Sequence, residues 1–257
     1  MGERLTNHNR SRSRAGAGLE LARIAHALKR GDKRDLVKDS RLVASLTRAE
    51  VTGVENLPLA LEPTILVLNH PSAKDTVLSA AHVNAAFDAA RDVDDAGKNI
   101  LWFVAENLQS RRRPVSRKQA LSERITFSIG SKALTMMHAT YDLLPVPINY
   151  ENPELQKHER TQVLFKARDH LRNPNGSMTV GMFPEGAIED SENPHEFFQG
   201  IGALIKMVRG EVCVIPTNVF RDEKRALHVA FQKPLQIQRN ESRADITNRI
   251  QSAIRLV

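Results

Sequence analysis

Hydrophobic residues occur along this chain in short continuous runs that are separated by longer segments of mixed character. The clearest runs occupy residues 64–68, 178–183 and 212–218. A run without polar alternation is typical of a strand buried on both faces, as in a parallel sheet covered by helices. Further strands are predicted at 51–58 (a strand followed by a turn), 100–105, 144–149 and 227–231.

The segments between these runs predict helices. Helical patterns occupy 19–30, 33–48, 72–89, a stretch that ends near 141, 156–172, 195–209 and 243–257. Strands therefore alternate with helices along most of the chain, which predicts an α/β fold. We expect a largely parallel central sheet flanked by helices and preceded by N-terminal amphipathic helices.

The domain organisation follows from length and local composition. The 257 residues suffice for one α/β domain with a small appendage. Residues 1–17 are polar and basic and predict a flexible tail. Residues 18–48 predict a helical, membrane-associating segment, and residues 49–257 form the main domain.

The first helix is amphipathic, because Leu21, Ile24, Ala25 and Leu28 fall on one face. Positive charges surround it and the second helix. A basic amphipathic helix binds an anionic membrane surface. The alternative is that both helices pack on the domain and expose a solvated basic face. The charges concerned are Arg23, Lys29, Arg30, Lys33, Arg34 and Lys38.

The net charge of +7 predicts an anionic partner: a nucleic acid, an acidic lipid surface, a phosphorylated substrate or an acidic carrier protein. Aromatic residues make up 5% of the chain, too few for stacking on exposed bases, and we expect no nucleic-acid partner. We find neither 18 consecutive apolar residues nor a signal-peptide core, which predicts a cytoplasmic protein peripherally associated with the membrane. The single cysteine, Cys213, excludes an intrachain disulfide and reads as a buried structural thiol.

The first candidate site residues follow the run at 64–68. His70 precedes a proline and is therefore expected to be extended at the end of a strand. Asp75 lies about one turn into the next helix, where a side chain leans back toward the N-terminus. The carboxylate is thus expected to reach the imidazole, fix its tautomer and stabilise the imidazolium, as a general base requires.

The second candidate group follows the run at 178–183. Glu185 lies just past that strand in a proline–glycine turn, where Gly186 permits close approach of backbone or ligand. Ligands of parallel α/β sheets bind beyond the carboxyl ends of the strands, which favours a role for Glu185 in a site. Capping of the following helix is the structural alternative for this carboxylate.

Together these segments resemble the glycerolipid acyltransferase family typified by 1-acylglycerol-3-phosphate acyltransferases. The resemblance covers residues 53–220, and the blocks occur in the family's order. The blocks are Val54-Glu55-Asn56-Leu57-Pro58, Asn69-His70 with Asp75, Phe183-Pro184-Glu185-Gly186, Phe197-Phe198-Gln199-Gly200-Ile201-Gly202-Ala203 and Val214-Ile215-Pro216.

The resemblance implies transfer of a fatty acyl group from acyl-CoA or an acyl-carrier protein to the hydroxyl of a lysophospholipid. His70 and Asp75 would be the catalytic pair. Asn69, Glu185 and Gly186 would bind the acceptor or organise the site. No metal and no cofactor other than the thioester donor is implied. The implied product, from 1-acylglycerol 3-phosphate, is phosphatidic acid.

Two of the family's arginines are missing. Ala187 and Ile188 follow the Phe-Pro-Glu-Gly block where threonine or serine and then arginine are common, and the segment 144–150 also lacks one. An arginine that binds phosphate bidentately is not easily replaced. Phosphate or carrier contacts would then come from Lys74 or from a basic cluster that is otherwise a solvated loop: Arg111, Arg112, Arg113, Arg117 and Lys118.

The missing arginines leave other acceptors open, namely glycerol 3-phosphate or a lyso-aminolipid. A hypothesis of another class is a basic protein that binds membranes or nucleic acid peripherally and has no catalytic activity. The presence of His70, Asp75 and Glu185 together argues against it.

Overall fold

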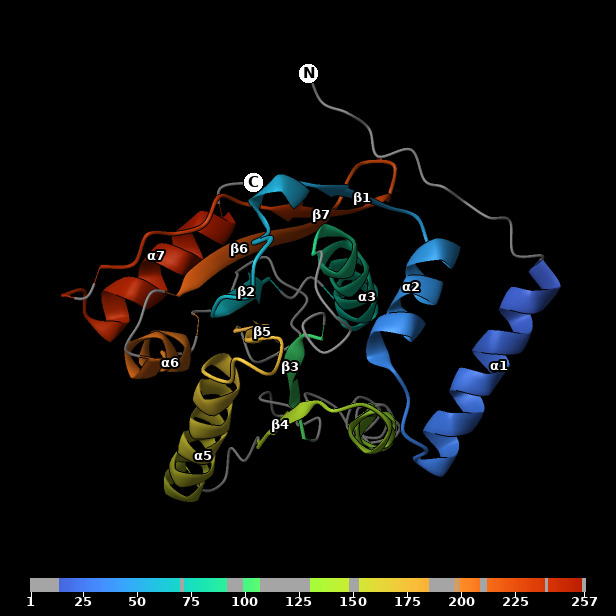
Figure 1. Cartoon of the computed structure of the whole chain (residues 1–257), viewed down its shortest axis with the longest axis horizontal. Coiled ribbons are helices and arrows are strands. Elements are labelled where there is room, and N and C mark those ends of the chain that lie inside the picture. Colours follow the sequence, from blue (N-terminus) through green and yellow to red (C-terminus); the bar gives the residue numbers. More distant parts are fainter. Residues whose placement is uncertain are drawn as a thin grey trace, which may run out of the picture.

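The computed structural model describes residues 14–69, 72–91, 99–106, 130–147, 153–184, 197, 199–208, 212–238 and 240–255. A central sheet with helices on both faces dominates this part of the chain (Figure 1). The α/β class and the largely parallel sheet expected from the sequence are therefore confirmed.

The sheet has seven strands among the described residues, in the order β1-β7-β6-β2-β5-β3-β4. β6, β2, β5, β3 and β4 run parallel to one another, whereas β7 is antiparallel to β6 and β1 is parallel to β7. The strands are β1 (Ala49–Thr52), β2 (Thr64–Leu68), β3 (Leu101–Ala105), β4 (Leu144–Val146), β5 (Thr179–Met182), β6 (Cys213–Arg221) and β7 (Leu227–Phe231).

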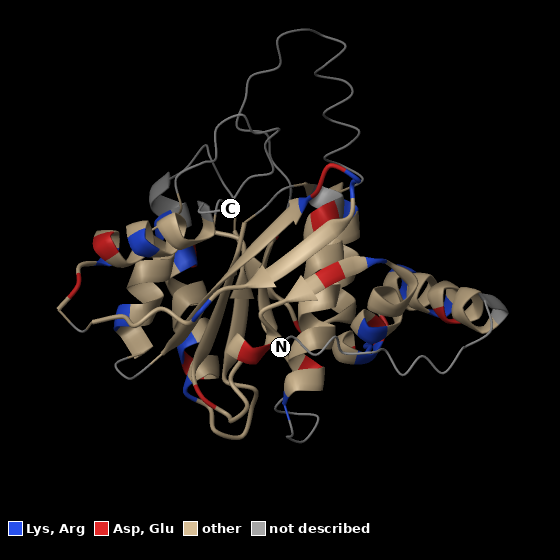
Figure 2. Cartoon of the chain, turned by 90° about the horizontal axis from the view of Figure 1, so that it is seen from above, with Lys and Arg blue, Asp and Glu red and all other residues tan. Residues whose placement is uncertain are grey.

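Two hydrophobic clusters, one on each face, hold the sheet between its helices. α5 (Pro153–Leu171), α6 (Gly200–Val208) and α7 (Arg243–Arg255) pack on one face, and α3 (Ala73–Ala90) packs on the other. β2 contributes Ile65 and Val67 to the first cluster and Leu66 and Leu68 to the second, and all four are fully buried. The continuous apolar run at 64–68 thus forms a strand covered on both faces, as its pattern predicts. In Figure 2 the central strands are largely free of charged residues, which lie mainly on helices and connecting segments.

The second N-terminal helix, α2 (Leu36–Leu46), is built into the domain. It packs on α3, where the guanidinium of Arg41 donates two hydrogen bonds to Asp88 and Asn84 donates to the hydroxyl of Ser40 at 3.0 Å. The buried carboxylate of Asp39 accepts from Arg34 at 2.6 Å and from the hydroxyl of Tyr141 at 2.8 Å. Removing α2 would leave these buried polar groups without partners, a costly change.

The first helix, α1 (Arg14–Arg30), lies outside α2 (Figure 1) and touches it through a small cluster around Ile24 and Leu42. The amphipathic face expected from the sequence is only partly covered: Ile24 is buried and Leu28 is half-buried, whereas Leu21 and Ala25 are exposed. Neither alternative, membrane binding or packing on the domain, describes both helices. α2 packs on the domain, whereas α1 keeps apolar residues exposed to solvent.

A pH dependence of stability follows from two histidines, of which His82 is buried and His170 is half-buried. Burial lowers the pKa of His82, whose ring lies 3.0 Å from the hydroxyl of Thr47, and of His170, which contacts Ser177. Because the folded-state pKa of each histidine is lowered, the unfolded chain binds protons at a higher pH than the folded protein does. The stability that the two neutral histidines contribute is therefore fully present above the ordinary histidine pKa of about 6.5. It is lost as the pH falls through the folded-state pKa.

The free energy of unfolding is therefore expected to decrease between pH 7.5 and pH 5.5. Urea unfolding of the wild type and of His82→Gln and His170→Gln at several pH values measures this slope, which should be shallower in each variant. His26→Gln, on an exposed position of α1, is the matched control. A slope equal to that of the wild type in both His82→Gln and His170→Gln would contradict this prediction.

Candidate active site at the carboxyl ends of the central strands

The candidate residues leave the sheet from neighbouring strands. Leu68, the last residue of β2, pairs with Thr217 of β6, and Val67 pairs with Met182, the last residue of β5. Because these strands are parallel, the chain emerges from all three at the same edge of the sheet. The strand ends that precede His70 and Glu185 are thus adjacent, as expected for a site of this fold class.

Asn69 joins the end of β2 to β6. Its side-chain amide donates to the backbone carbonyl of Val219 at 2.8 Å, and its side-chain oxygen accepts from the Val219 backbone N–H at 2.6 Å. The amide thereby replaces the ladder hydrogen bonds that β2 no longer supplies beyond Leu68. These two hydrogen bonds fix the Asn69 side chain against β6, and its role in a site is a prediction.

α3 begins directly after this segment, and its first turn carries Asp75. Ser72 is the N-cap, and its hydroxyl accepts from the backbone N–H of Asp75 at 3.1 Å. A carboxylate in the first turn of a helix is further stabilised by the helix dipole. The cap fixes where α3 starts and therefore holds the Asp75 backbone close to the end of β2.

The Asp75 carboxylate is buried and paired with Arg221, the last residue of β6. Arg221 Nε lies 3.1 Å from each carboxylate oxygen, and Nη2 lies 2.5 Å from Oδ1. Asp75 raises the pKa of Arg221, chiefly through these hydrogen bonds. The sequence analysis missed Arg221, because it ended this strand at Asn218, whereas β6 extends to Arg221.

The end of β5 is held by aromatic packing. Phe183 stacks on Trp102 of β3 with ring centroids 5.7 Å apart, and the Trp102 indole donates to Asn84 of α3 at 3.0 Å. Gly181 makes this possible, because a Cβ there would lie 2.6 Å from the Trp102 ring. The conformation of the strand end that leads to Glu185 thus depends on both β3 and α3.

Most of the other predicted site residues lie outside the described part of the chain. Lys74 belongs to the first turn of α3, but its side chain is not described. Across the described ranges, no three His, Cys, Asp or Glu side chains come together as a metal ion would require. The predicted residues outside the described ranges are His70, Arg111, Arg112, Arg113, Arg117, Lys118, Glu185 and Gly186.

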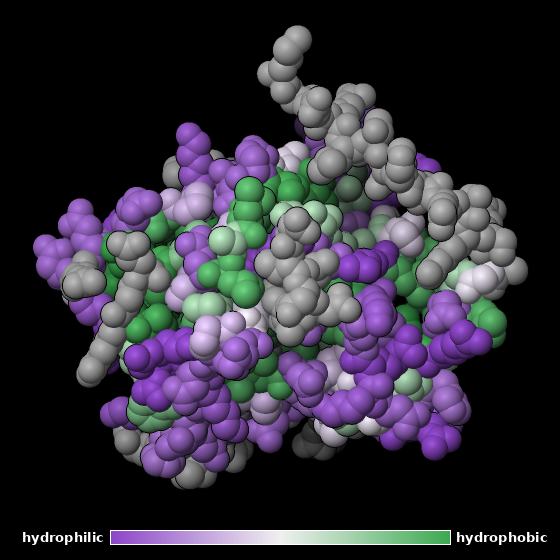
Figure 3. Space-filling model, in the orientation of Figure 1, coloured by the Kyte–Doolittle hydropathy of each residue, from purple (hydrophilic) through white to green (hydrophobic). Residues whose placement is uncertain are grey.

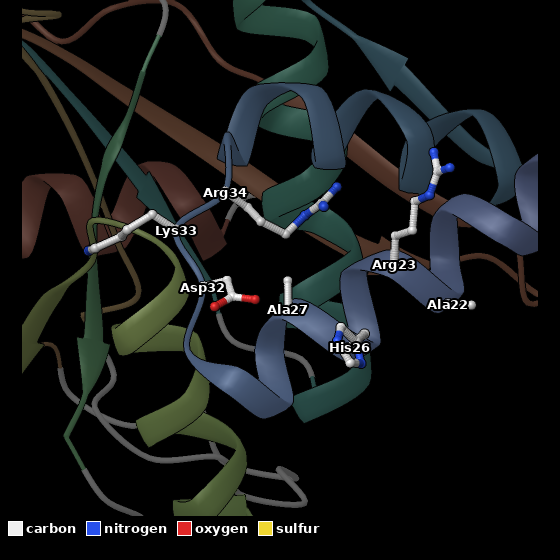
Figure 4. Close-up of a pocket in the computed structure, with 7 residues that line it drawn as sticks. All are labelled: Ala22, Arg23, His26, Ala27, Asp32, Lys33 and Arg34. Carbon is white, nitrogen blue, oxygen red and sulfur yellow. The ribbon is translucent and has the colours of Figure 1, made fainter.

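A hollow of about 440 Å³ lies elsewhere, between α1 and the segment that joins it to α2 (Figure 4). Its cations already have acidic partners: Arg23 with Glu20, Arg34 with Asp39, and Lys33 with Asp142. None of its lining residues comes from the strand ends. The hollow is therefore separate from the candidate site. It is lined by Ala22, Arg23, His26, Ala27, Asp32, Lys33 and Arg34.

Cys213 at the start of β6 does not contribute a nucleophile. Burial, followed by the charge of Glu62, raises the pKa of its thiol to about 11, so it stays protonated near neutral pH. A protonated thiol fits the structural role that the sequence predicts, but Cys213 is half-buried rather than fully buried as expected.

Comparison with known proteins adds one structural likeness. No family model and no curated protein matches this chain. Among solved structures, it is similar to the 1-acyl-sn-glycerophosphate (LPA) acyltransferase PlsC from Thermotoga maritima, with 15% sequence identity and a TM-score of 0.46. The superposition covers 95% of this chain and 82% of that one. At this identity and TM-score the likeness assigns neither a family nor an activity to the chain.

Proposed function

We propose that this protein is an acyltransferase that transfers a fatty acyl group from a thioester to the hydroxyl of a lysolipid. The observation that carries the proposal is the placement of Asp75: a buried carboxylate in the first turn of α3, the helix that follows β2 and His70 in the sequence. The motif blocks around Asn69 and Phe183 lie on adjacent strand ends, which further supports one shared site.

The mechanism uses His70 as general base. Its imidazole takes the proton of the acceptor hydroxyl while Asp75 stabilises the imidazolium that forms. The acceptor oxygen attacks the thioester carbonyl, and the tetrahedral intermediate collapses with cleavage of the carbon–sulfur bond. The imidazolium then returns the proton to the leaving thiolate. Glu185 and Gly186 would shape the acceptor site, and no covalent acyl-enzyme is needed.

The acceptor we propose first is 1-acylglycerol 3-phosphate, which gives phosphatidic acid. Glycerol 3-phosphate or a lyso-aminolipid would use the same chemistry. Lys74 and the basic cluster of residues 111–118 would supply the phosphate contacts that the missing arginines do not. The donor is acyl-CoA or an acyl-carrier protein.

Thioester consumption tests the proposal. Wild type and His70→Ala are assayed with acyl-CoA and with acyl-carrier protein, against lysophosphatidic acid, glycerol 3-phosphate and a lyso-aminolipid. Turnover that requires both an acceptor and His70 would establish the acyltransferase. No turnover with any pair by folded protein would refute it, and strongly salt-dependent binding of DNA would then favour the non-catalytic hypothesis.

The substrates also require contact with a membrane. In the described part of the chain, we find no helix with the length and hydrophobicity to cross a bilayer. α1 instead exposes Leu19 and Leu21 among basic residues, and Figure 3 shows mixed hydrophobic and hydrophilic side chains over its end of the molecule. We propose that α1 binds anionic bilayers reversibly through these leucines and nearby cations.

The double variant Leu19→Ser, Leu21→Ser is expected to bind phosphatidylglycerol-containing vesicles at least about tenfold more weakly in a flotation assay. The reason is that burial of one leucine contributes about 1.5–3 kcal/mol. Leu59→Ser is the matched control, since Leu59 is 72% exposed, more than the other large hydrophobic residues that the structure describes, and belongs to the segment before β2. Unchanged flotation of the double variant would contradict the role of α1. Point variants are preferable to deletion of residues 1–48, because α2 is part of the core.

A further inference from the structure

β6 extends further than β2, its parallel neighbour in the sheet. Its residue Thr217 pairs with Leu68, where β2 ends, while residues 218–221 continue and pair with β7. These four residues, the β6 extension, contact the described residues that precede and follow His70 in the sequence. Val219 binds Asn69 at the end of β2, and Arg221 binds Asp75 in the first turn of α3.

The Arg221 guanidinium is itself fixed from both sides. Nε and Nη2 bind Asp75, while Nη1 donates to the backbone carbonyl of Arg225. That carbonyl belongs to a closed turn, in which Arg225 has a φ of 61° and Asp222 accepts from the backbone N–H groups of Arg225 and Ala226 at 2.8 and 2.7 Å. The guanidinium therefore has little freedom to turn toward a ligand.

We infer that Arg221 is a positioning residue that acts on the reaction through Asp75. The Asp75 side chain is only 10% exposed, and Arg221 compensates its negative charge through a two-point contact. A carboxylate has about four lone-pair positions, so these contacts do not exhaust its capacity to orient an imidazole. This role rests on the function proposed above.

The same geometry separates positioning from phosphate binding. An arginine that bound the acceptor phosphate would chiefly lower KM for phosphorylated acceptors. The kinetic effect of removing it would be the same whether or not Asp75 is present. An arginine that positions Asp75 affects kcat with every acceptor, and its loss has no further effect once Asp75 is gone. A small misplacement of a catalytic group costs about 10²-fold in rate.

The test is a double-mutant cycle of wild type, Arg221→Gln, Asp75→Asn and the double variant, with Arg221→Lys added. We expect Arg221→Gln to lower kcat about 10²-fold at nearly constant KM for lysophosphatidic acid, and to have almost no effect in the Asp75→Asn background. Arg221→Lys should recover only part of the rate, since lysine cannot make the two-point contact. Circular dichroism and urea unfolding establish that each variant is folded.

A second readout does not need acyl transfer. Labelling of His70 by diethyl pyrocarbonate, followed by mass spectrometry, reports the state of its imidazole. Arg221→Gln and Asp75→Asn are expected to change the labelling rate in the same direction. If the wild type transfers no acyl group, the proposed function fails, and an altered labelling rate still supports the positioning role. Equal labelling of wild type and Arg221→Gln, additive kinetic effects in the cycle, or a change in KM alone would each overturn it.

Discussion

Asparagine in place of Asp75 is expected to slow thioester consumption about 10⁴-fold, the loss that this substitution causes in a hydrolase triad with the same division of roles. Asparagine has nearly the size of aspartate but carries no charge. It cannot stabilise an imidazolium, and its NH₂ group favours the wrong imidazole tautomer. The measurement is kcat with saturating acceptor and donor, beside the wild type and His70→Ala.

The fold of this variant is expected to persist. Ser72 still caps α3 through its own hydroxyl, and the Arg221 side chain is 35% exposed, so solvent screens the charge that loses its partner. Asp142→Asn is the matched control, because that carboxylate also pairs with a cation, Lys33, but is 92% exposed and lies outside the candidate site. A variant at position 75 that kept more than about a tenth of wild-type kcat would exclude Asp75 from the catalytic step, since a charged triad partner contributes far more than that.

The elements around Asp75 could be predicted because their signals are local. The apolar run at 64–68 specifies a strand covered on both faces, and β2 has these bounds. The residues after it specify the start of a helix, and α3 spans Ala73–Ala90 where a helix over 72–89 was expected. The placement of Asp75 one turn into that helix therefore follows from the sequence alone.

Arg221 could not be predicted, because its position depends on pairing between segments that no local pattern connects. β6 reaches Arg221 only because that residue pairs with Leu227 of β7. The partner of Arg221, Asp75, is 146 positions away in the sequence. An isolated arginine after an apolar run is usually a solvated charge, and this fold makes it a neighbour of the candidate catalytic carboxylate.

The partners of the N-terminal cations could not be predicted for a similar reason. Arg34 counts as one of the positive charges around the first two helices, yet it binds the buried Asp39, which also accepts from Tyr141, 102 positions further on. A charge pattern gives the number of cations but not their partners. The resulting basic surface is smaller than the sequence implies, and the exposed leucines of α1 become the more informative feature for membrane binding.

Alanine in place of Gly202 is expected to destabilise the protein by about 3 kcal/mol, near the upper end for overpacking in a closely packed core. Gly202 lies on α6 at the point where the first turn of α7 packs against it. A Cβ there would lie 2.2 Å from the backbone carbonyl oxygen of Arg243 and 2.9 Å from the Thr247 hydroxyl. Because the nearest atom is backbone, a rotamer change cannot relieve the contact, and the two helices must move apart at Ile246 and Ile250.

Thermal unfolding measures this effect, and a loss of about 3 kcal/mol corresponds to a Tm lowered by about 6–12 °C for a domain of this size. Gly200→Ala is the matched control, since it lies on the same helix and a Cβ there meets no atom within 4 Å. Its Tm should be unchanged or slightly raised, because alanine is the better helix former. The Gly202 contact belongs to the cluster on the face opposite α3 and Asp75, so kcat of the folded Gly202→Ala protein should match the wild type. A Tm equal to that of Gly200→Ala would mean that α6 and α7 are not packed as closely as these distances require.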